Sequence, residues 1–150
     1  MFSVYGAGQN MANLKQGMVS IYLAYVLDGK EVPVKGSFKR FRDLVHVDDV
    51  CAAWLSALSR PSTPSLAYNL GTGTPTTVGE LLKKIFAACG ERADYPAKEL
   101  SGTPGDQFGL CADASRARAE LAWKPAVTLD RGLKEMADWA RALKSPARTR

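Results

Sequence analysis

The sequence predicts an α/β or α+β fold, in which short strands alternate with about five helices. Helices are indicated where apolar residues recur every three or four positions, and strands where short β-rich runs lie between turn residues. The chain has 150 residues, of which 46% are hydrophobic and 23% are charged, so it can bury a core of ordinary size. These observations indicate one globular domain rather than a disordered chain.

The N-terminal part is predicted to run from a strand into a helix. Residues 1–10, MFSVYGAGQN, pass from a β-rich stretch into a glycine turn, so the chain is expected to begin inside a strand. Apolar residues at helical spacing predict a helix over 13–28, and Gly29 is a suitable stop for it. Short strands are expected over 31–34 and 44–47.

The middle of the chain carries two cap signals. Asp48 or Asp49 can cap a helix, and Thr77 with Glu80 matches a capping box, in which each residue satisfies a free backbone amide of the other. Between these helices, a strand is expected over 66–70. The first helix is expected to bury one face, made of Val50, Trp54, Ala57 and Leu58.

The C-terminal part is predicted to hold two more helices. Asp113 can cap a short helix that ends near Trp123, and the last helix is expected to start after Thr128. We expect residues 1–143 to form a substrate-binding domain and residues 144–150 to form a basic, disordered tail.

Cysteine use and hydropathy bear on the environment of the protein. Cys51, Cys89 and Cys111 are odd in number and far apart, which is typical of buried thiols in a reducing cytoplasm and not of a disulfide framework or zinc site. The longest apolar run, 18–27, is too short to span a bilayer. A cytoplasmic protein without membrane contact is therefore expected.

The net charge of +5 is concentrated near the C-terminus. Such a basic tail is more typical of a solubilising chain end than of a nucleic-acid arm, and no recognised nucleic-acid-binding module accompanies it. Nucleic acid is therefore not an expected partner. The positive charges of this end lie on Arg141, Lys144, Arg148 and Arg150.

The segment 71–76, GTGTPT, has two interpretations. A strand, glycines and a helix in sequence suggest a dinucleotide-binding loop, with Asp94 near the position of a ribose-binding acid. That motif needs a third glycine for close packing, and Thr76 occupies its place. A tight turn with a good helix cap is the favoured interpretation.

Few side chains suggest acid–base or metal chemistry. His46 is the only histidine and alternates with valines in a strand, which favours a packed side chain over a catalytic one. One histidine and scattered cysteines give no metal-ligand spacing. A tyrosine acid–base pair would need a nearby cation, and no lysine follows by four residues after Tyr22, Tyr25, Tyr68 or Tyr95.

Two short segments could bind anions or hydroxyl groups. In 40–50, RFRDLVHVDDV, the arginines either flank a core strand as solvated charges or bind an anion at the strand entrance. In 102–109, GTPGDQFG, Asp106 either bonds its own backbone in a turn or accepts the two hydroxyls of a ribose. Spacing alone favours the turn for Asp106.

Taken in order, these segments resemble a known family. VYGAGQN, QGMVSIY, KGSFKRFRDLVHVDDV, YNLGTGTPTTVGEL, TPGDQFGLCADASRARAELAWKP and a helix with Trp139-Ala140 resemble the C-terminal half of extended short-chain dehydrogenases/reductases. Within that superfamily the chain looks like the NAD-dependent nucleotide-sugar epimerases and dehydratases, and most like UDP-glucose 4-epimerases. The resemblance spans Phe2 to about Leu143.

The resemblance implies a site for a nucleotide sugar. By position, Arg42 would bind the diphosphate and Asp106 the uridine ribose, while Gly17, Met18 and Val19 would place backbone groups against the nucleotide. A helix start and an arginine both suit phosphate, because free amides and a planar fork of donors face the anion. Under this interpretation Arg40 is a flanking surface charge.

Three positions depart from the family pattern. Ser3 stands where an asparagine often contacts substrate, and Thr103 stands where an arginine often meets the phosphates. Leu44 replaces a residue that is commonly aromatic and near the base. Each change removes a polar or stacking contact.

The resemblance also implies what the parent enzyme does. The parent reaction is 4-epimerisation of a UDP-hexose, with NAD and a YxxxK pair that belong to a dinucleotide-binding half before Met1. NAD is therefore not expected to bind this chain alone, which is expected to be inactive, to bind a UDP-sugar, to meet a possible separate NAD-binding half and to self-associate. Alternatives are a non-catalytic nucleotide- or protein-binding module, or an inert remnant.

Overall fold

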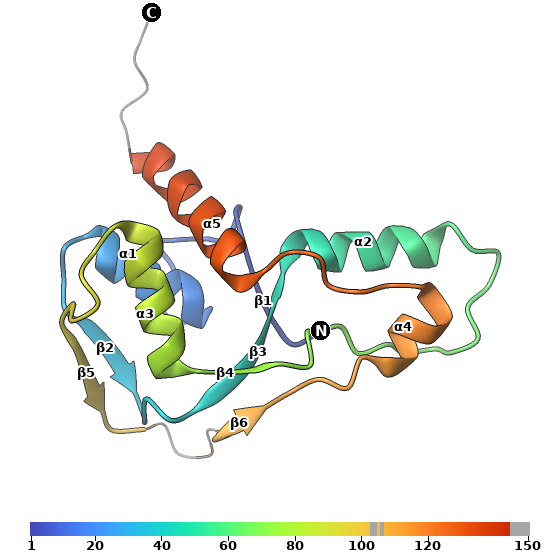
Figure 1. The fold of residues 1–150 in the computed structure, drawn as a ribbon, viewed down its shortest axis with the longest axis horizontal. Helices are drawn as coiled ribbons and strands as arrows, with labels where there is room; N and C mark the ends of the chain where they lie inside the picture. Colours follow the sequence, from blue (N-terminus) through green and yellow to red (C-terminus); the bar gives the residue numbers. More distant parts are fainter. Residues whose placement is uncertain (103–104, 106, 145–150) are drawn as a thin grey trace, which may run out of the picture.

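The computed structural model describes residues 1–102, 105 and 107–144 and has the expected α/β architecture (Figure 1). In chain order its elements are β1 (Ser3–Tyr5), α1 (Met18–Leu27), β2 (Val32–Lys35), β3 (Phe41–His46), α2 (Val47–Leu58), β4 (Pro75–Thr77), α3 (Val78–Cys89), β5 (Ala97–Leu100), β6 (Gly109–Leu110), α4 (Ser115–Leu121) and α5 (Leu129–Lys144).

Strand β3 is the centre of the larger sheet. β1 pairs with it in parallel, with Ser3 opposite Leu44, and β4 pairs antiparallel, with Phe41 opposite Thr77. β6 also pairs with β3 in parallel, with Gly109 opposite Phe41. Every other strand of this sheet therefore takes its position from β3.

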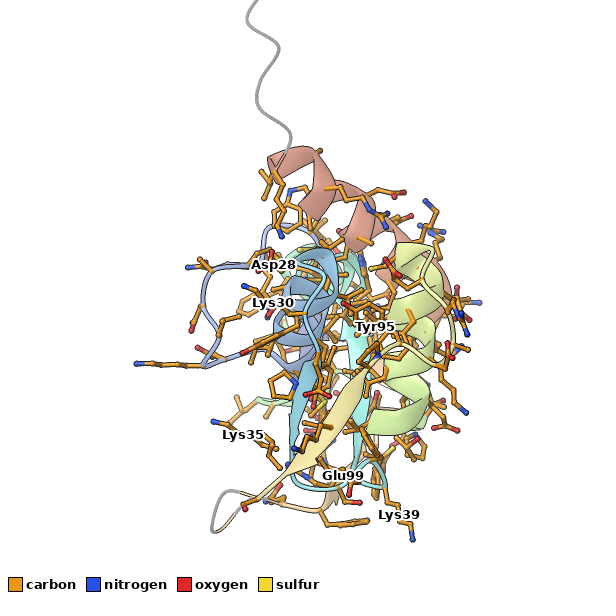
Figure 2. All side chains as sticks on the ribbon, turned by 90° about the vertical axis from the view of Figure 1, so that its left-hand side faces the viewer. Asp28, Lys30, Lys35, Lys39, Tyr95 and Glu99 are labelled. Carbon is orange, nitrogen blue, oxygen red and sulfur yellow. The ribbon has the colours of Figure 1, made fainter. Side chains whose placement is uncertain are left out.

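A second, two-stranded sheet joins β2 and β5 in parallel, with Val34 opposite Glu99. Figure 2 looks onto this side of the molecule and labels Lys35 of β2 and Glu99 of β5. Tyr95, before β5, donates its hydroxyl to the backbone oxygen of Lys30 over 3.0 Å, which ties the start of one strand to the other.

Two apolar clusters form the core. The larger lies among α1, α3, α5 and β2, at the end of the molecule opposite α2 and α4 (Figure 1). The smaller joins β3, α2 and α4, and there the indole nitrogen of Trp123 donates to the backbone oxygen of Asp49 over 2.7 Å. Burial of apolar area of this kind is the main force that holds the layers together.

Helix α1 begins later than the predicted 13–28. Gly17 has a φ of 90° and cannot lie within a right-handed helix. Before it, the side chains of Asn10 and Asn13 accept the amides of Ala12 and Lys15, both over 3.0 Å, so local turns replace the first helical turn.

The strand predictions were right for some segments and wrong for others. β3 starts at Phe41 rather than residue 44, because residues 41–43 pair with β4 and β6, and such pairing is invisible in local spacing. Residues 66–70 form no strand, although the amide of Phe2 donates to the oxygen of Leu70 over 3.1 Å. This segment is therefore a loop that contacts the chain just before β1.

The cap and the face of α2 differ from those predicted. The His46 side chain, not Asp48 or Asp49, caps the helix by accepting the amide of Asp48. The predicted face is only partly right. Val50 is buried and Ala57 packs against the smaller cluster, but Trp54 and Leu58 are exposed, and the buried side chains of α2 are Asp49, Val50 and Ala53. Small side chains face β3 and α4, where space is limited.

The remaining helices follow the prediction closely. The Thr77–Glu80 capping box is present and α3 ends at Gly90 in a left-handed conformation, and α5 starts after Thr128. α5 continues through Lys144, so this residue belongs to the helix and not to the predicted tail. Its ammonium group donates to Asp28. Residues 145–150 lie outside the described part.

The other helix prediction was partly right. The Asp113 carboxylate accepts the amide of Ser115 over 2.9 Å beside α4, and that helix ends at Leu121, before Trp123. No helix among residues 1–102 and 107–144 has both the length and the apolar composition needed to cross a membrane.

The cysteine prediction was right only for Cys89, which is buried. Cys51 and Cys111 are exposed, because they lie on the outer side of α2 and beside β6.

Candidate functional site

Four of the five predicted site residues lie around one cavity. A space of about 490 Å³ opens between the start of α1 and strand β3 and is lined by Gly17, Met18, Val19 and Arg42. Asp106, the fifth, is outside the described residues, as is Thr103. The remaining lining residues are Met1, Phe2, Ser3, Val4, Gln9, Gln16 and Leu44.

The entry to α1 is shaped by Gly17. Its φ of 90° favours glycine, and a Cβ at this position would lie 2.2 Å from Nε2 of Gln9 and 2.6 Å from Oγ of Ser20, so both side chains would have to move. The Ser20 hydroxyl donates to the Gly17 oxygen over 2.9 Å, and no side chain caps the helix. The first amides of α1, which have no acceptor within the helix, and its dipole make this end electropositive.

Arg42 extends from β3 toward the same cavity and is half-buried. Its guanidinium donates to the backbone oxygens of Phe41, Gln107 and Phe108 over 2.7, 3.0 and 3.4 Å. Because three carbonyl groups hold the planar group, its direction is defined before any ligand arrives. A preorganised guanidinium loses less freedom when it binds an anion.

Arg40 is buried rather than the surface charge that was expected. Its side chain is 8% exposed, and its guanidinium donates to the backbone oxygen of Lys35 over 2.8 Å and to that of Gln107 over 3.5 Å. Gly36 makes this possible, because a Cβ there would lie 2.7 Å from Nη1 of Arg40. The arginine therefore folds over the turn between β2 and β3.

A second cavity, of about 400 Å³, shares Gly17, Met18 and Arg42 with the first. The shared residues place the two cavities next to each other, with the α1 start and Arg42 between them. The second cavity combines basic and aromatic side chains. Its other lining residues are Leu14, Lys15, Ile21, Tyr22, Tyr25, Pro33, Lys35 and Arg40.

The aspartate of the RFRD segment, Asp43, was missed in the sequence. It is fully buried, and its Oδ1 accepts the amide and the hydroxyl of Thr72 over 2.8 and 2.7 Å. Its Oδ2 accepts the amide of Gly73 over 2.8 Å. A usable signal existed, since strand alternation puts the residue after Arg42 on the opposite face, toward the core.

His46 is a structural residue beside Tyr5 and α5. Its Nδ1 accepts the amide of Asp48 over 3.3 Å, and its ring packs edge-on against Tyr5 at 5.3 Å. Gly132 lets α5 approach, because a Cβ there would lie 2.4 Å from the Tyr5 hydroxyl oxygen. Burial, and then the charge of nearby carboxylates including Glu135, raises the pKa of Tyr5, which therefore stays protonated.

Among the described residues, one cluster has metal-ligating atoms close together: His46, Asp48 and Glu135. Two of these groups already have partners, however. Nδ1 of His46 serves as the cap of α2, and Glu135 accepts from Arg131 over 2.9 Å. We therefore assign these residues to the packing of α2 and α5.

A protein-family model described as GDP-mannose 4,6 dehydratase matches residues 1–136. The chain belongs to this family. Its members include NAD-dependent nucleotide-sugar epimerases and dehydratases, so the resemblance in the sequence is confirmed at the level of the family.

Known members of the GDP-mannose 4,6-dehydratase family are similar along nearly the whole chain. A dTDP-L-rhamnose 4-epimerase from Burkholderia thailandensis is 30% identical over 91% of this chain and 37% of its own. The UDP-glucose 4-epimerase of Thermotoga maritima, solved with UDP-glucose, is 32% identical, with a TM-score of 0.87 over 96% of this chain and 45% of that one.

A third relative was solved with a cofactor. MoeE5, in complex with UDP-glucuronic acid and NAD, is 28% identical, with a TM-score of 0.83 over 95% of this chain and 46% of its own. The chain thus spans less than half the length of these relatives. Over that length it has the same fold as these relatives.

The 71–76 loop does not fit an NAD pyrophosphate, although the family uses NAD. The amides of Thr72 and Gly73, which a dinucleotide loop would offer to phosphate, already bind the buried Asp43 carboxylate. Asp94, the possible ribose ligand, instead pairs with Arg92 over 2.8 Å at the surface. The favoured interpretation, a tight turn before a capped helix, is confirmed.

Proposed function

We propose that this chain binds the nucleotide-sugar substrate of an NAD-dependent epimerase or dehydratase, with the diphosphate between Arg42 and the start of α1. The proposal rests on one observation: Gly17, Met18, Val19 and Arg42 all line the same cavity. A helix N-terminus without a side-chain cap and an oriented arginine converge there, and both are complementary to phosphate.

The two adjacent cavities supply room for the two ends of such a ligand. We assign the nucleoside to the cavity of about 400 Å³, where the rings of Tyr22 and Tyr25 and the stem of Lys35 offer apolar surface to a base. The sugar then occupies the cavity of about 490 Å³, on the other side of Arg42. Asp106, one residue before Gln107, is the proposed ribose ligand.

The parent reaction is proposed to be 4-epimerisation of a UDP-hexose. NAD, when bound in such an enzyme, supplies the hydride acceptor, and a tyrosine–lysine pair moves the proton. The part played by this chain is to bind and orient the substrate. With UDP-glucose or UDP-galactose and NAD, the chain by itself is proposed to give no interconversion.

Calorimetric titration tests the proposal with UDP, UDP-glucose, pyrophosphate and NAD. We expect UDP and UDP-glucose to bind, pyrophosphate to bind more weakly and NAD to bind least. Weaker UDP binding by Arg42→Ala, with an unchanged unfolding curve, would support the assignment. Absence of UDP and UDP-glucose binding by the folded wild-type chain would overturn it, and clear turnover above the no-protein control would overturn the proposal of inactivity.

A further inference from the structure

Asp43 and Arg42 are consecutive residues of β3, so their side chains point to opposite faces of the sheet. Both nevertheless hold the same segment of chain, 107–112. Arg42 donates to the oxygens of Gln107 and Phe108, at the start of the segment. Asp43 Oδ2 accepts the amide of Ala112 over 3.0 Å, at its end.

The middle of the segment is attached to the same strand. β6 pairs with β3, with Gly109 opposite Phe41 and Leu110 opposite Arg42. The next residue, Cys111, also contacts this strand, because its thiol lies 3.8 Å from Asp43 Oδ2. Segment 107–112 therefore depends on three consecutive residues of β3, and the contribution of Asp43 is a carboxylate that accepts the amide of Ala112.

From this geometry we infer that Asp43 is a positioning residue for the nucleotide site. It fixes segment 107–112, and through the oxygens of Gln107 and Phe108 it fixes the guanidinium of Arg42, without touching the ligand. Asp43 lines neither of the two cavities beside Arg42. This inference rests on the proposed function, because it assumes that Arg42 meets the diphosphate.

The chemistry of Asp43 leaves little room for replacement. Its two oxygens accept from three amides and one hydroxyl, which a carboxylate can do because both oxygens are acceptors. An asparagine would turn an NH₂ group toward amide donors. Gly71 packs directly against this carboxylate, since a Cβ there would lie 2.4 Å from the Ala112 Cβ and 2.7 Å from Asp43 Oδ2.

Asp49 provides a matched control. It is also a buried aspartate, and its two oxygens accept the amides of Ala126 and Val127 over 2.8 and 3.1 Å. Its partners lead into α5 and not into segment 107–112. The pair Asp43→Asn and Asp49→Asn therefore makes the same chemical change in two similar settings, only one of which is linked to Arg42.

The test measures UDP binding by calorimetry, at a temperature where each variant is folded, and hydrogen exchange of the 107–112 backbone by mass spectrometry. We expect Asp43→Asn to weaken UDP binding about ten-fold and to speed exchange in 107–112, whereas Asp49→Asn leaves both near the wild-type values. Thr72→Val, which removes the hydroxyl donor to Asp43 together with the acceptor of the Thr74 amide, serves if Asp43→Asn does not fold. It should weaken UDP binding about two- to three-fold.

Equal UDP affinities for Asp43→Asn and Asp49→Asn would overturn the positioning role, as would unchanged exchange in 107–112. If Asp43→Asn does not fold, an unchanged UDP affinity in Thr72→Val would also overturn it. The result is separable from the proposed function: a wild-type chain that binds no UDP would overturn that function, and faster exchange in Asp43→Asn would still show the anchoring of the segment.

Discussion

Arg40 and Arg42 donate to the same backbone oxygen, that of Gln107, over 3.5 and 3.0 Å. Their settings differ, because Arg40 is 8% exposed while Arg42 is half-buried and lines both cavities beside α1. Two arginines that share one acceptor can thus be separated by experiment. One should matter mainly for folding and the other mainly for the ligand.

Replacing each arginine by alanine tests this division. Arg42→Ala should weaken pyrophosphate binding about five-fold, or about 1 kcal/mol, because solvent screens a partly exposed contact. Arg40→Ala should lower the free energy of unfolding by about 1–3 kcal/mol, since the oxygens of Lys35 and Gln107 lose a buried donor. Calorimetry and urea unfolding measure the two effects.

Lys39 is the control for both variants, because it is an exposed cation in the turn between β2 and β3, shortly before both arginines (Figure 2). Lys39→Ala should change pyrophosphate binding only slightly, and less as salt is added. If Arg40→Ala weakens pyrophosphate binding more than Arg42→Ala does in the folded protein, the diphosphate has been assigned to the wrong arginine.

Asp106 should distinguish nucleoside from phosphate. Because its proposed partner is the ribose, Asp106→Ala should weaken UDP binding by about 1–2 kcal/mol and leave pyrophosphate binding unchanged. Asp94→Ala is the control, since Asp94 pairs with Arg92 at the surface. Equal losses for UDP and pyrophosphate in Asp106→Ala would indicate an electrostatic effect and rule out a ribose contact.

A local signal predicted the start of α3 well, although the cap of α2 is His46 rather than Asp48 or Asp49. The capping box of Thr77 and Glu80 involves residues three positions apart, so its motif already contains both partners. The start of β3 depends instead on pairing with β4 and β6, which lie far along the chain. No spacing rule applied to residues 41–43 alone contains that information.

The site was predictable in part for the same reason. Arg42 and residues 17–19 were found through the order of motifs, and the fold brings them to one cavity. Asp43 was missed because its donors are 29, 30 and 69 residues away, at Thr72, Gly73 and Ala112. Strand alternation indicates only the face on which Asp43 lies, and the groups that bind its buried charge are known only from the fold.

Helix α3 should give the chain an acid-sensitive component of stability. The Thr77 amide, and then its hydroxyl, donate to Glu80 and lower the pKa of that carboxyl from its ordinary value of 4.5. A lowered folded-state pKa stabilises the protein above pH 4.5, and the contribution is lost as the pH falls through the folded-state value.

Glu80→Gln should therefore flatten the dependence of unfolding free energy on pH below about 4.5, compared with wild type. Urea unfolding at several pH values measures it, with Glu91→Gln as an exposed glutamate control near the other end of α3. Thr77→Ala should destabilise the protein by about 1 kcal/mol, because the first turn of α3 loses its cap. Parallel pH profiles for Glu80→Gln and wild type would contradict the role assigned to Glu80.

The outer face of α2 should mediate self-association. Trp54, Leu55 and Leu58 are 59, 67 and 75% exposed, and no charged residue follows Asp49 within this helix. A contiguous apolar face of this kind is unusual on a monomer, so the chain should form at least dimers at high concentration.

The double variant Trp54→Glu with Leu58→Lys should shift the mass measured by light scattering toward the monomer, because charges would have to be desolvated at the contact. Leu143→Lys, at an exposed leucine near the end of α5, should not. A monodisperse wild-type monomer at high concentration would contradict the prediction, and a double variant that associates as strongly as wild type would place the contact elsewhere.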